Sequence, residues 1–331
     1  MFSKDFRNCI FYALIILLTF VSISVFTPLS VSADDFSVSD GILTKYNGPG
    51  GSVNIPSNVQ KIGGSAFQNN DKVTSVSIPE GCFAIEDGAF DGCINMNMVS
   101  LPNTLTSIGT LAFARCKSLE YIHLPSALET IKGGAFYDCD SLGSVQIPAE
   151  TGTVENGCFS NCDNLILLET DPSNSSFTAI DNVLYTADKK TLIQYPGGKA
   201  DRSFTIPDGV ETVGADSFKG QRHLEEIVFS STVREIREKA FSGCTSITSV
   251  DLPENIQKIY EYSFRNCTNL CRVYVHNKDQ QTIATAFDGD ASVILYGYDD
   301  SLIQTHAKKY NIRFRKLDND VYDYPDPEIK F

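Results

Sequence analysis

The chain has 331 residues, 21% of them charged, and a formal net charge of −14 at pH 7. A surplus of acidic residues cannot neutralise phosphates, so we expect no nucleic-acid partner. The same excess of negative charge keeps an exported protein soluble.

Residues 1–33 have the organisation of a targeting segment. Lys4 and Arg7 form a basic start, residues 9–26 are strongly apolar, and Val31-Ser32-Ala33 fits a small-residue cleavage site. This order predicts a secretory signal peptide and a secreted or extracellular-surface location. The apolar run is also long enough to remain as an anchor, so we expect contact with a membrane only through an uncleaved segment.

Residues 34–54 are expected to form an N-terminal hairpin. They precede a repeat array, and the exposed core edge of such an array must be capped.

An Ala-Phe dipeptide, or a close variant, then returns every 23 residues over 55–170 and again over 206–276. Units of this size cannot bury an apolar face alone and must stack on their neighbours, so the period predicts a solenoid. The repeated phenylalanines are Phe67, Phe90, Phe113, Phe136, Phe159, Phe218, Phe241 and Phe264.

Other apolar residues keep fixed positions relative to each Phe, as Ile62 and Val76 do around Phe67. The second of these positions alternates with polar neighbours, as in Ser75-Val76-Ser77, which is the pattern of a strand with one buried face. Proline follows this strand in most units, and it suits a strand end because it lacks the ladder N–H. We therefore predict stacked 23-residue coils with a parallel β-sheet, mainly β with short turns or 3-10 segments.

Residues 171–205 interrupt the repeats. The stretch 177–195 reads as a β-hairpin whose two runs flank Asp188-Lys189-Lys190. Phe177–Leu184 also parallels Phe36–Leu43 at the start of the array. Because the sequence recurs where a cap is needed, we favour a structural role, with a protruding recognition loop as the alternative.

After the repeats, residues 277–317 are expected to close the open end of the last coil. Val293–Tyr296 predicts a strand, Ser301–Tyr310 a short helix and Ile312–Phe314 a final strand. Residues 318–331 form an acidic tail.

The motif LPNTLTSIGTLAFARCKSL at Leu101–Leu119 resembles the BspA-like class of bacterial leucine-rich repeats, and the likeness extends from about Ile55 to Val275. The resemblance implies a curved leucine-rich-repeat solenoid. Members of that class are commonly secreted or surface proteins, and those of known activity are mostly adhesins. It therefore implies a non-enzymatic, adhesin-like protein that binds an extracellular protein or glycan.

Eight of the ten cysteines fall in apolar positions of the repeat, and we expect them to be core residues, since a buried free Cys behaves as a small hydrophobe. Cysteines at the same position of adjacent coils could nevertheless come close enough to form a disulfide. Cys271 falls in an outward position. Its spacing from Cys267 allows a metal, although the repeat accounts for Cys267 without one.

The sequence contains none of the common hydrolase, nucleotide-binding or zinc-protease motifs, and its four histidines are scattered. Asp288-Gly289-Asp290 resembles part of a calcium loop but lacks the rest of the pattern. We expect no catalytic residues, no metal site and no cofactor.

The strand positions that point outward form the candidate binding face, because solenoids present such sheets to ligands. Aromatic and apolar residues in those positions are favoured interface anchors, although single exposed apolar residues are also normal on any surface. We expect the contact to centre on Tyr121 and His123. The full candidate set is Met98, Tyr121, His123, Gln146, Arg272 and Tyr274. A passive spacer without a ligand, or recognition by the inserted hairpin, are the alternatives.

Overall fold

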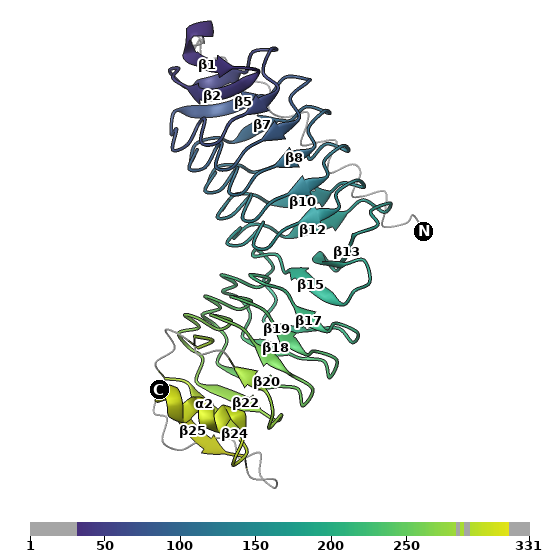
Figure 1. Cartoon of the computed structure of the whole chain (residues 1–331), viewed down its shortest axis with the longest axis vertical. Coiled ribbons are helices and arrows are strands. Elements are labelled where there is room, and N and C mark those ends of the chain that lie inside the picture. Colours follow the sequence, from purple (N-terminus) through teal and green to yellow (C-terminus); the bar gives the residue numbers. More distant parts are fainter. Residues whose placement is uncertain (1–31, 283–284, 288–291, 318–331) are drawn as a thin grey trace, which may run out of the picture. The chain divides into compact units, whose positions relative to one another are not determined.

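The computed structural model describes residues 32–282, 285–287 and 292–317. They belong to one compact unit, in which the chain winds into coils that stack in sequence order (Figure 1). The predicted acidic tail, and the predicted signal peptide up to residue 31, lie outside the described residues. Within them, no helix combines the length and apolar character needed to cross a membrane.

The predicted strand is present on one side of the coils, where neighbouring strands pair in parallel within three separate sheets. Its residues alternate between buried and exposed, as β5 shows with Val76 buried between Ser75 and Ser77. The strands on this side are β3 (Gly51–Asn54), β5 (Val73–Ser77), β7 (Met98–Ser100), β10 (Ser144–Ile147), β12 (Leu167–Thr170), β16 (Ser203–Thr205), β18 (Glu226–Val228), β20 (Ser249–Leu252), β22 (Arg272–Val275), β24 (Ile294–Gly297) and β25 (Arg313–Lys316).

A second line of parallel strands, which the sequence analysis did not anticipate, runs along another side of the coils. Each of its strands in the repeats has two residues, and the second is the apolar residue five positions before the Phe, or Thr282 in the last strand. The apolar ladder is thus enclosed between two sets of strands. These strands are β4 (Lys61–Ile62), β6 (Ala84–Ile85), β8 (Ser107–Ile108), β9 (Thr130–Ile131), β11 (Thr153–Val154), β17 (Thr212–Val213), β19 (Glu235–Ile236), β21 (Lys258–Ile259) and β23 (Gln281–Thr282).

The repeated phenylalanines stack as a ladder of rings. Neighbouring ring centroids lie 4.8–5.5 Å apart from Phe67 to Phe159, and 4.8–5.6 Å apart from Phe218 to Phe287. Offset stacking of this kind adds to the stabilisation from burial alone. The Phe lies in a turn rather than a 3-10 segment, since the described 3-10 helix is Ala33–Asp35 (η1).

Each of these turns needs left-handed backbone two residues after the Phe. The residues at this position include Asn69, Gly92 and Asp138, with φ between 57° and 77°. Gly, Asn and Asp tolerate this conformation better than other residues do. Arg115 is an exception, with φ 58°. Its guanidinium lies 2.6 Å from the buried carboxylate of Asp91, a contact that offsets part of the local strain.

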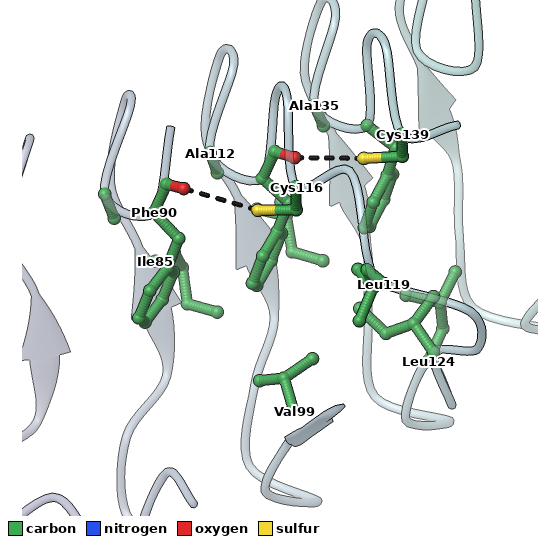
Figure 2. Close-up of a cluster of buried hydrophobic side chains, with 14 of the residues drawn as sticks. Ile85, Phe90, Val99, Ala112, Cys116, Leu119, Leu124, Ala135 and Cys139 are labelled. Carbon is green, nitrogen blue, oxygen red and sulfur yellow. Dashed lines mark hydrogen bonds between the residues drawn. The ribbon is translucent and has the colours of Figure 1, made fainter. Parts of the chain in front are cut away.

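The predicted core cysteines are buried, and the nine described cysteines are thiols rather than disulfides. A cysteine three positions after the Phe donates its S–H to the backbone carbonyl of the Phe in the preceding coil, over 3.1–3.3 Å (Figure 2). This contact gives each thiol a partner other than the next sulfur. The six thiols belong to Cys93, Cys116, Cys139, Cys162, Cys244 and Cys267.

The insert differs from the predicted single hairpin. It has three strands, β13 (Phe177–Ile180), β14 (Val183–Thr186) and β15 (Thr191–Gln194), joined antiparallel through two turns. The turn near Asp188 is the second of these. The sequence pattern missed β13 as a separate strand because Asp181-Asn182 takes a left-handed turn of two residues, with φ 51° and 66°.

The module at the start of the array has the same design. β1 (Phe36–Ser39) and β2 (Ile42–Tyr46) form an antiparallel hairpin whose turn at Asp40-Gly41 is also left-handed, with φ 51° and 75°. Tyr46 then stacks on Phe67 at 4.9 Å, and Tyr195 stacks on Phe218 at 5.0 Å. Each module therefore supplies the first ring of a Phe ladder.

Strand β14 forms a wall between two hydrophobic cores. Leu184 packs into the core that runs from Leu43 to Phe177, whereas Val183 and Tyr185 pack into the core that continues to Ala307. In a strand buried on both faces, residues do not alternate between buried and exposed, and three consecutive residues of β14 are indeed buried. The insert thus ends one stack and begins the next.

The last described segment closes the second core. Helix α2 (Leu302–Tyr310) begins at Ser301, whose hydroxyl accepts a hydrogen bond from the Gln304 N–H, and ends at the left-handed Asn311. Ile303 and Ala307 of this helix are fully buried in the core. Strand β25 then pairs with β24.

Candidate binding surface

The insert divides the outward residues of the longer strands into two sets. The N-terminal strand face consists of Ser52, Asn54, Ser75, Ser77, Met98, Ser100, Tyr121, His123, Ser144, Gln146, Leu167 and Glu169. The C-terminal strand face consists of Ser203, Thr205, Glu226, Val228, Ser249, Asp251, Arg272, Tyr274, Tyr296, Arg313 and Arg315.

The six predicted site residues are not one cluster. Met98, Tyr121, His123 and Gln146 belong to the N-terminal strand face, and all four are exposed. Met98 is 61% and Tyr121 59% exposed, more than any other large exposed hydrophobic side chain in the described residues. By contrast, Arg272 and Tyr274 are half-buried and lie on the C-terminal strand face, beyond the insert.

The strand ladder is interrupted at Tyr121. This residue makes a single isolated bridge to Ser144, and the sheet of β3, β5 and β7 ends at β7. Among the described residues, no strand pairing joins β7 to the segment around Tyr121. The pairing of the longer strands is therefore interrupted between the coils that carry Met98 and Tyr121, although the short strands and the Phe rings continue through them. Departures from regularity are expected where a fold serves function.

The two faces differ in charge. Glu169 is the single carboxylate of the N-terminal strand face, which includes neither Lys nor Arg. Serine hydroxyls of the N-terminal strand face can bond across coils, as those of Ser75 and Ser52 do over 2.8 Å. The C-terminal strand face instead includes Glu226, Asp251 and several arginines.

A histidine that the sequence analysis treated as scattered has a defined partner on the C-terminal strand face. His276 Nε2 lies 2.6 Å from Asp251 Oδ1. The hydrogen bond to this carboxylate raises the pKa of His276 above its usual value, against the opposing effect of burial. Beside this pair, the rings of Tyr274 and Tyr296 stack at 4.7 Å. His276 and Asp251 are 25 residues apart in the sequence. Because this is close to the 23-residue repeat, the spacing could have indicated that they lie in neighbouring coils.

The repeat and its geometry agree with a known family model. Residues 46–166 and 199–300 match six copies of the BspA-type leucine-rich repeat region. The chain belongs to the BspA-type leucine-rich repeat family. A search of curated proteins finds no match.

Solved bacterial structures share the fold. A leucine-rich repeat protein from Eubacterium ventriosum is 26% identical with a TM-score of 0.60, over 79% of this chain and 74% of the other. A leucine-rich cell surface protein from Faecalibacterium prausnitzii is 25% identical with a TM-score of 0.53, over 84% of this chain and 94% of the other. The pneumococcal vaccine antigen PcpA, 18% identical over 87% of this chain and 98% of its own, has a TM-score of 0.62 and shows likeness of fold alone.

Membership of the BspA-type family separates what the fold requires from what it leaves free. The stacked Phe rings, the thiols and the buried strand residues repeat from coil to coil, because each packs on its equivalent in the next. Outward residues such as Ser75, Met98 and Tyr121 differ although they occupy the same position of successive coils. Their identity is thus free to serve binding.

The structure gives the metal alternative no support within the described residues, where no group of three His, Cys, Asp or Glu side chains could hold an ion. The buried thiol of Cys267 donates to the Phe241 carbonyl, and Cys271 donates to the Asn269 carbonyl over 3.3 Å. Asp288-Gly289-Asp290 lies outside the described residues.

Proposed function

We propose that this BspA-type repeat protein is a secreted or surface-displayed binding protein that engages an extracellular protein or glycan through its N-terminal strand face. The contact centres on Tyr121 and His123, with Met98 and Gln146 beside them. No catalytic step is part of this proposal.

The observation that carries the proposal is the exposure of Met98 and Tyr121 at 61% and 59% in matching positions of successive coils. An isolated exposed apolar residue is ordinary on a protein surface. Two large ones at the same position of successive coils, where the pairing of the longer strands is interrupted, are the kind of anchor around which interfaces are built. The surface location is supported by the Faecalibacterium relative, which is named a cell surface protein.

The inserted module is a weaker candidate because its residues are needed inside the protein. Val183, Leu184 and Leu192 are fully buried, and Tyr195 is part of the ring ladder. Deleting residues 178–194 would open both cores, so loss of binding in such a variant would not identify a recognition site. The exposed turn at Ala187–Lys190 is the part that a ligand could reach.

A binding assay with surface substitutions tests the proposal. The full chain is applied to immobilised extracellular-matrix proteins, mucins and cell-wall polysaccharides. We expect Tyr121→Ala combined with His123→Ala to weaken binding about tenfold or more, because an anchor contributes above about 1–2 kcal/mol. The melting temperature should stay unchanged, because both side chains point away from the core.

Two control variants accompany this pair. Phe83→Ala removes an exposed ring on the side of the short strands, and Lys189→Asn changes the tip of the insert while suiting its left-handed backbone. Binding that survives the double substitution but is lost with Lys189→Asn would assign recognition to the insert. A chain that binds no member of the panel would favour the passive spacer.

A further inference from the structure

We infer that the ligand of the N-terminal strand face is a neutral glycan, bound along the row of hydroxyl groups with Tyr121 as a stacking platform. This inference rests on the proposed function and names the ligand class for the same surface.

The charge of the surface gives the first argument. The chain has a net charge of −14, yet the N-terminal strand face holds one carboxylate, Glu169, and neither Lys nor Arg. An anionic polysaccharide would require Lys or Arg, and a basic protein would require several carboxylates. The charges that either ligand would need occur on the C-terminal strand face instead, as with Arg272 and Asp251.

The hydrogen-bonding groups give the second argument. Ser75 and Ser77 lie on β5, Ser100 lies on the next strand β7, and Ser144 lies on β10, two coils further on. Their hydroxyls can both donate and accept. Sugar hydroxyls have the same dual capacity, so a saccharide can be satisfied by such a row in more than one orientation. The Gln146 amide adds both a donor and an acceptor at the same position of the sheet as Ser77.

The apolar groups give the third argument. The Tyr121 ring is 59% exposed, and a flat ring of this kind packs against the C–H face of a pyranose while its hydroxyl stays in water. Met98 offers a flexible, polarizable contact in the preceding coil. A stable protein interface buries about 800 Å² on each partner around an apolar centre. Two large apolar side chains among so many hydroxyls favour the sugar over the protein.

The spacing of the coils gives the fourth argument. Paired strands lie about 4.8 Å apart, a distance comparable with the length of one pyranose unit. An extended oligosaccharide lying across the paired strands β3, β5 and β7 would therefore present successive sugars to successive coils, with Tyr121 in the coil after β7. Side chains on regular strands hold their positions without ordering a loop, which limits the entropic cost of binding.

A glycan array tests the inference with the full chain. The probes are neutral oligosaccharides, their sialylated and sulfated counterparts, and a mucin before and after chemical removal of its glycans. We expect binding to neutral members, with affinity lowered about tenfold by Tyr121→Ala and largely kept by Tyr121→Phe, which retains the ring. Phe83→Ala is the matched control, since its exposed ring lies on another side of the same half.

Salt distinguishes the neutral ligand from a charged one. Raising the salt concentration from about 0.1 to 1 M shortens the screening length from about 10 to about 3 Å, and it should leave the affinity within about twofold. Binding confined to sulfated or sialylated probes, or strongly weakened by salt, would overturn the inference.

The mucin separates this inference from the proposed function. Binding that depends on Tyr121 but persists after deglycosylation would overturn the inference of a glycan ligand. The same face would then bind a protein. Binding that ignores Tyr121→Ala, or no binding at all, would overturn the proposed function together with the inference.

Discussion

The two halves of the solenoid share the interior of their coils and differ in their outward surface. In both, stacked rings begin at a Tyr supplied by a hairpin module, Tyr46 in one and Tyr195 in the other. In both, buried thiols donate to the Phe carbonyl of the preceding coil. The N-terminal strand face is nearly uncharged, whereas the C-terminal strand face contains Glu226, Asp251 and arginines.

The comparison shows which positions packing controls. An inward side chain meets its equivalents in the coils above and below, so a change of shape or charge disrupts two interfaces at once. An outward side chain meets solvent, and its identity costs the fold little. Because the halves are built alike inside, the difference between their surfaces points to different roles rather than to different folding requirements.

The largest expected effect tests whether β14 separates two cores. Leu184→Ala should destabilise the N-terminal stack by about 2–5 kcal/mol, since Leu184 is fully buried in that core. Val183→Ala, at the adjacent residue, should destabilise the C-terminal stack instead. Hydrogen exchange followed by peptide mass spectrometry measures each stack separately, because local stability in repeat proteins depends on neighbouring units.

In Leu184→Ala, amide protection should fall most in peptides from β9 to β12. In Val183→Ala, it should fall most in peptides from β17 to β20. The same pattern of lost protection in both variants would mean that the two cores unfold as one.

A smaller effect is expected in the thiol ladder that both halves share. Cys139→Ala should cost about 1–2 kcal/mol, because it removes a buried sulfur and leaves the Phe113 carbonyl with the Cys116 N–H as its remaining donor. Cys271→Ala, at a partly exposed position, should change stability by less than about 0.5 kcal/mol. Chemical denaturation of the two variants makes the comparison.

Alkylation of the native chain checks the same ladder. Burial raises the pKa of the Cys93, Cys158 and Cys162 thiols to about 12, so little reactive thiolate forms at neutral pH. Among the nine described cysteines, Cys271 should therefore react first. Disulfides joining Cys93, Cys116 and Cys139 in the native chain would contradict the ladder.

Much of the fold follows from the sequence because its signals are local and repeated. The Phe period predicted the stacked coils, and the Ser75-Val76-Ser77 alternation predicted the longer strands, which the structure confirms. The short strands were missed because two residues, such as Lys61-Ile62, are too few to show a periodic pattern. The third strand of the insert was missed because the turn that separates β13 from β14 consists of only two residues, Asp181-Asn182, within a continuous β-rich run.

The candidate site was harder to predict because it depends on contacts between coils. Exposure of Met98 and Tyr121 follows from the repeat alone. The interruption of the ladder at Tyr121 and the His276–Asp251 pair depend on how particular coils meet, which a single repeat unit does not reveal.

The smallest expected effect concerns an ion pair of the C-terminal strand face, which should make the stability of that half depend on pH. The Asp251 carboxylate raises the pKa of His276 in the folded chain, so folding favours the protonated imidazole. The contact between His276 and Asp251 therefore contributes fully to stability below the unfolded pKa of His276, about 6.5. This contribution is lost as the pH rises through the higher pKa of the folded chain. With Asp251 at 56% side-chain exposure, solvent screening keeps this contribution below about 1 kcal/mol.

Denaturation at several pH values between about 5 and 9 measures this contribution, with Asp251→Asn as the control that removes the charge and keeps the shape. The native chain should lose stability relative to the control across the window above about pH 6.5. An unaltered pH profile in Asp251→Asn would show that the contact between His276 and Asp251 does not stabilise the C-terminal half.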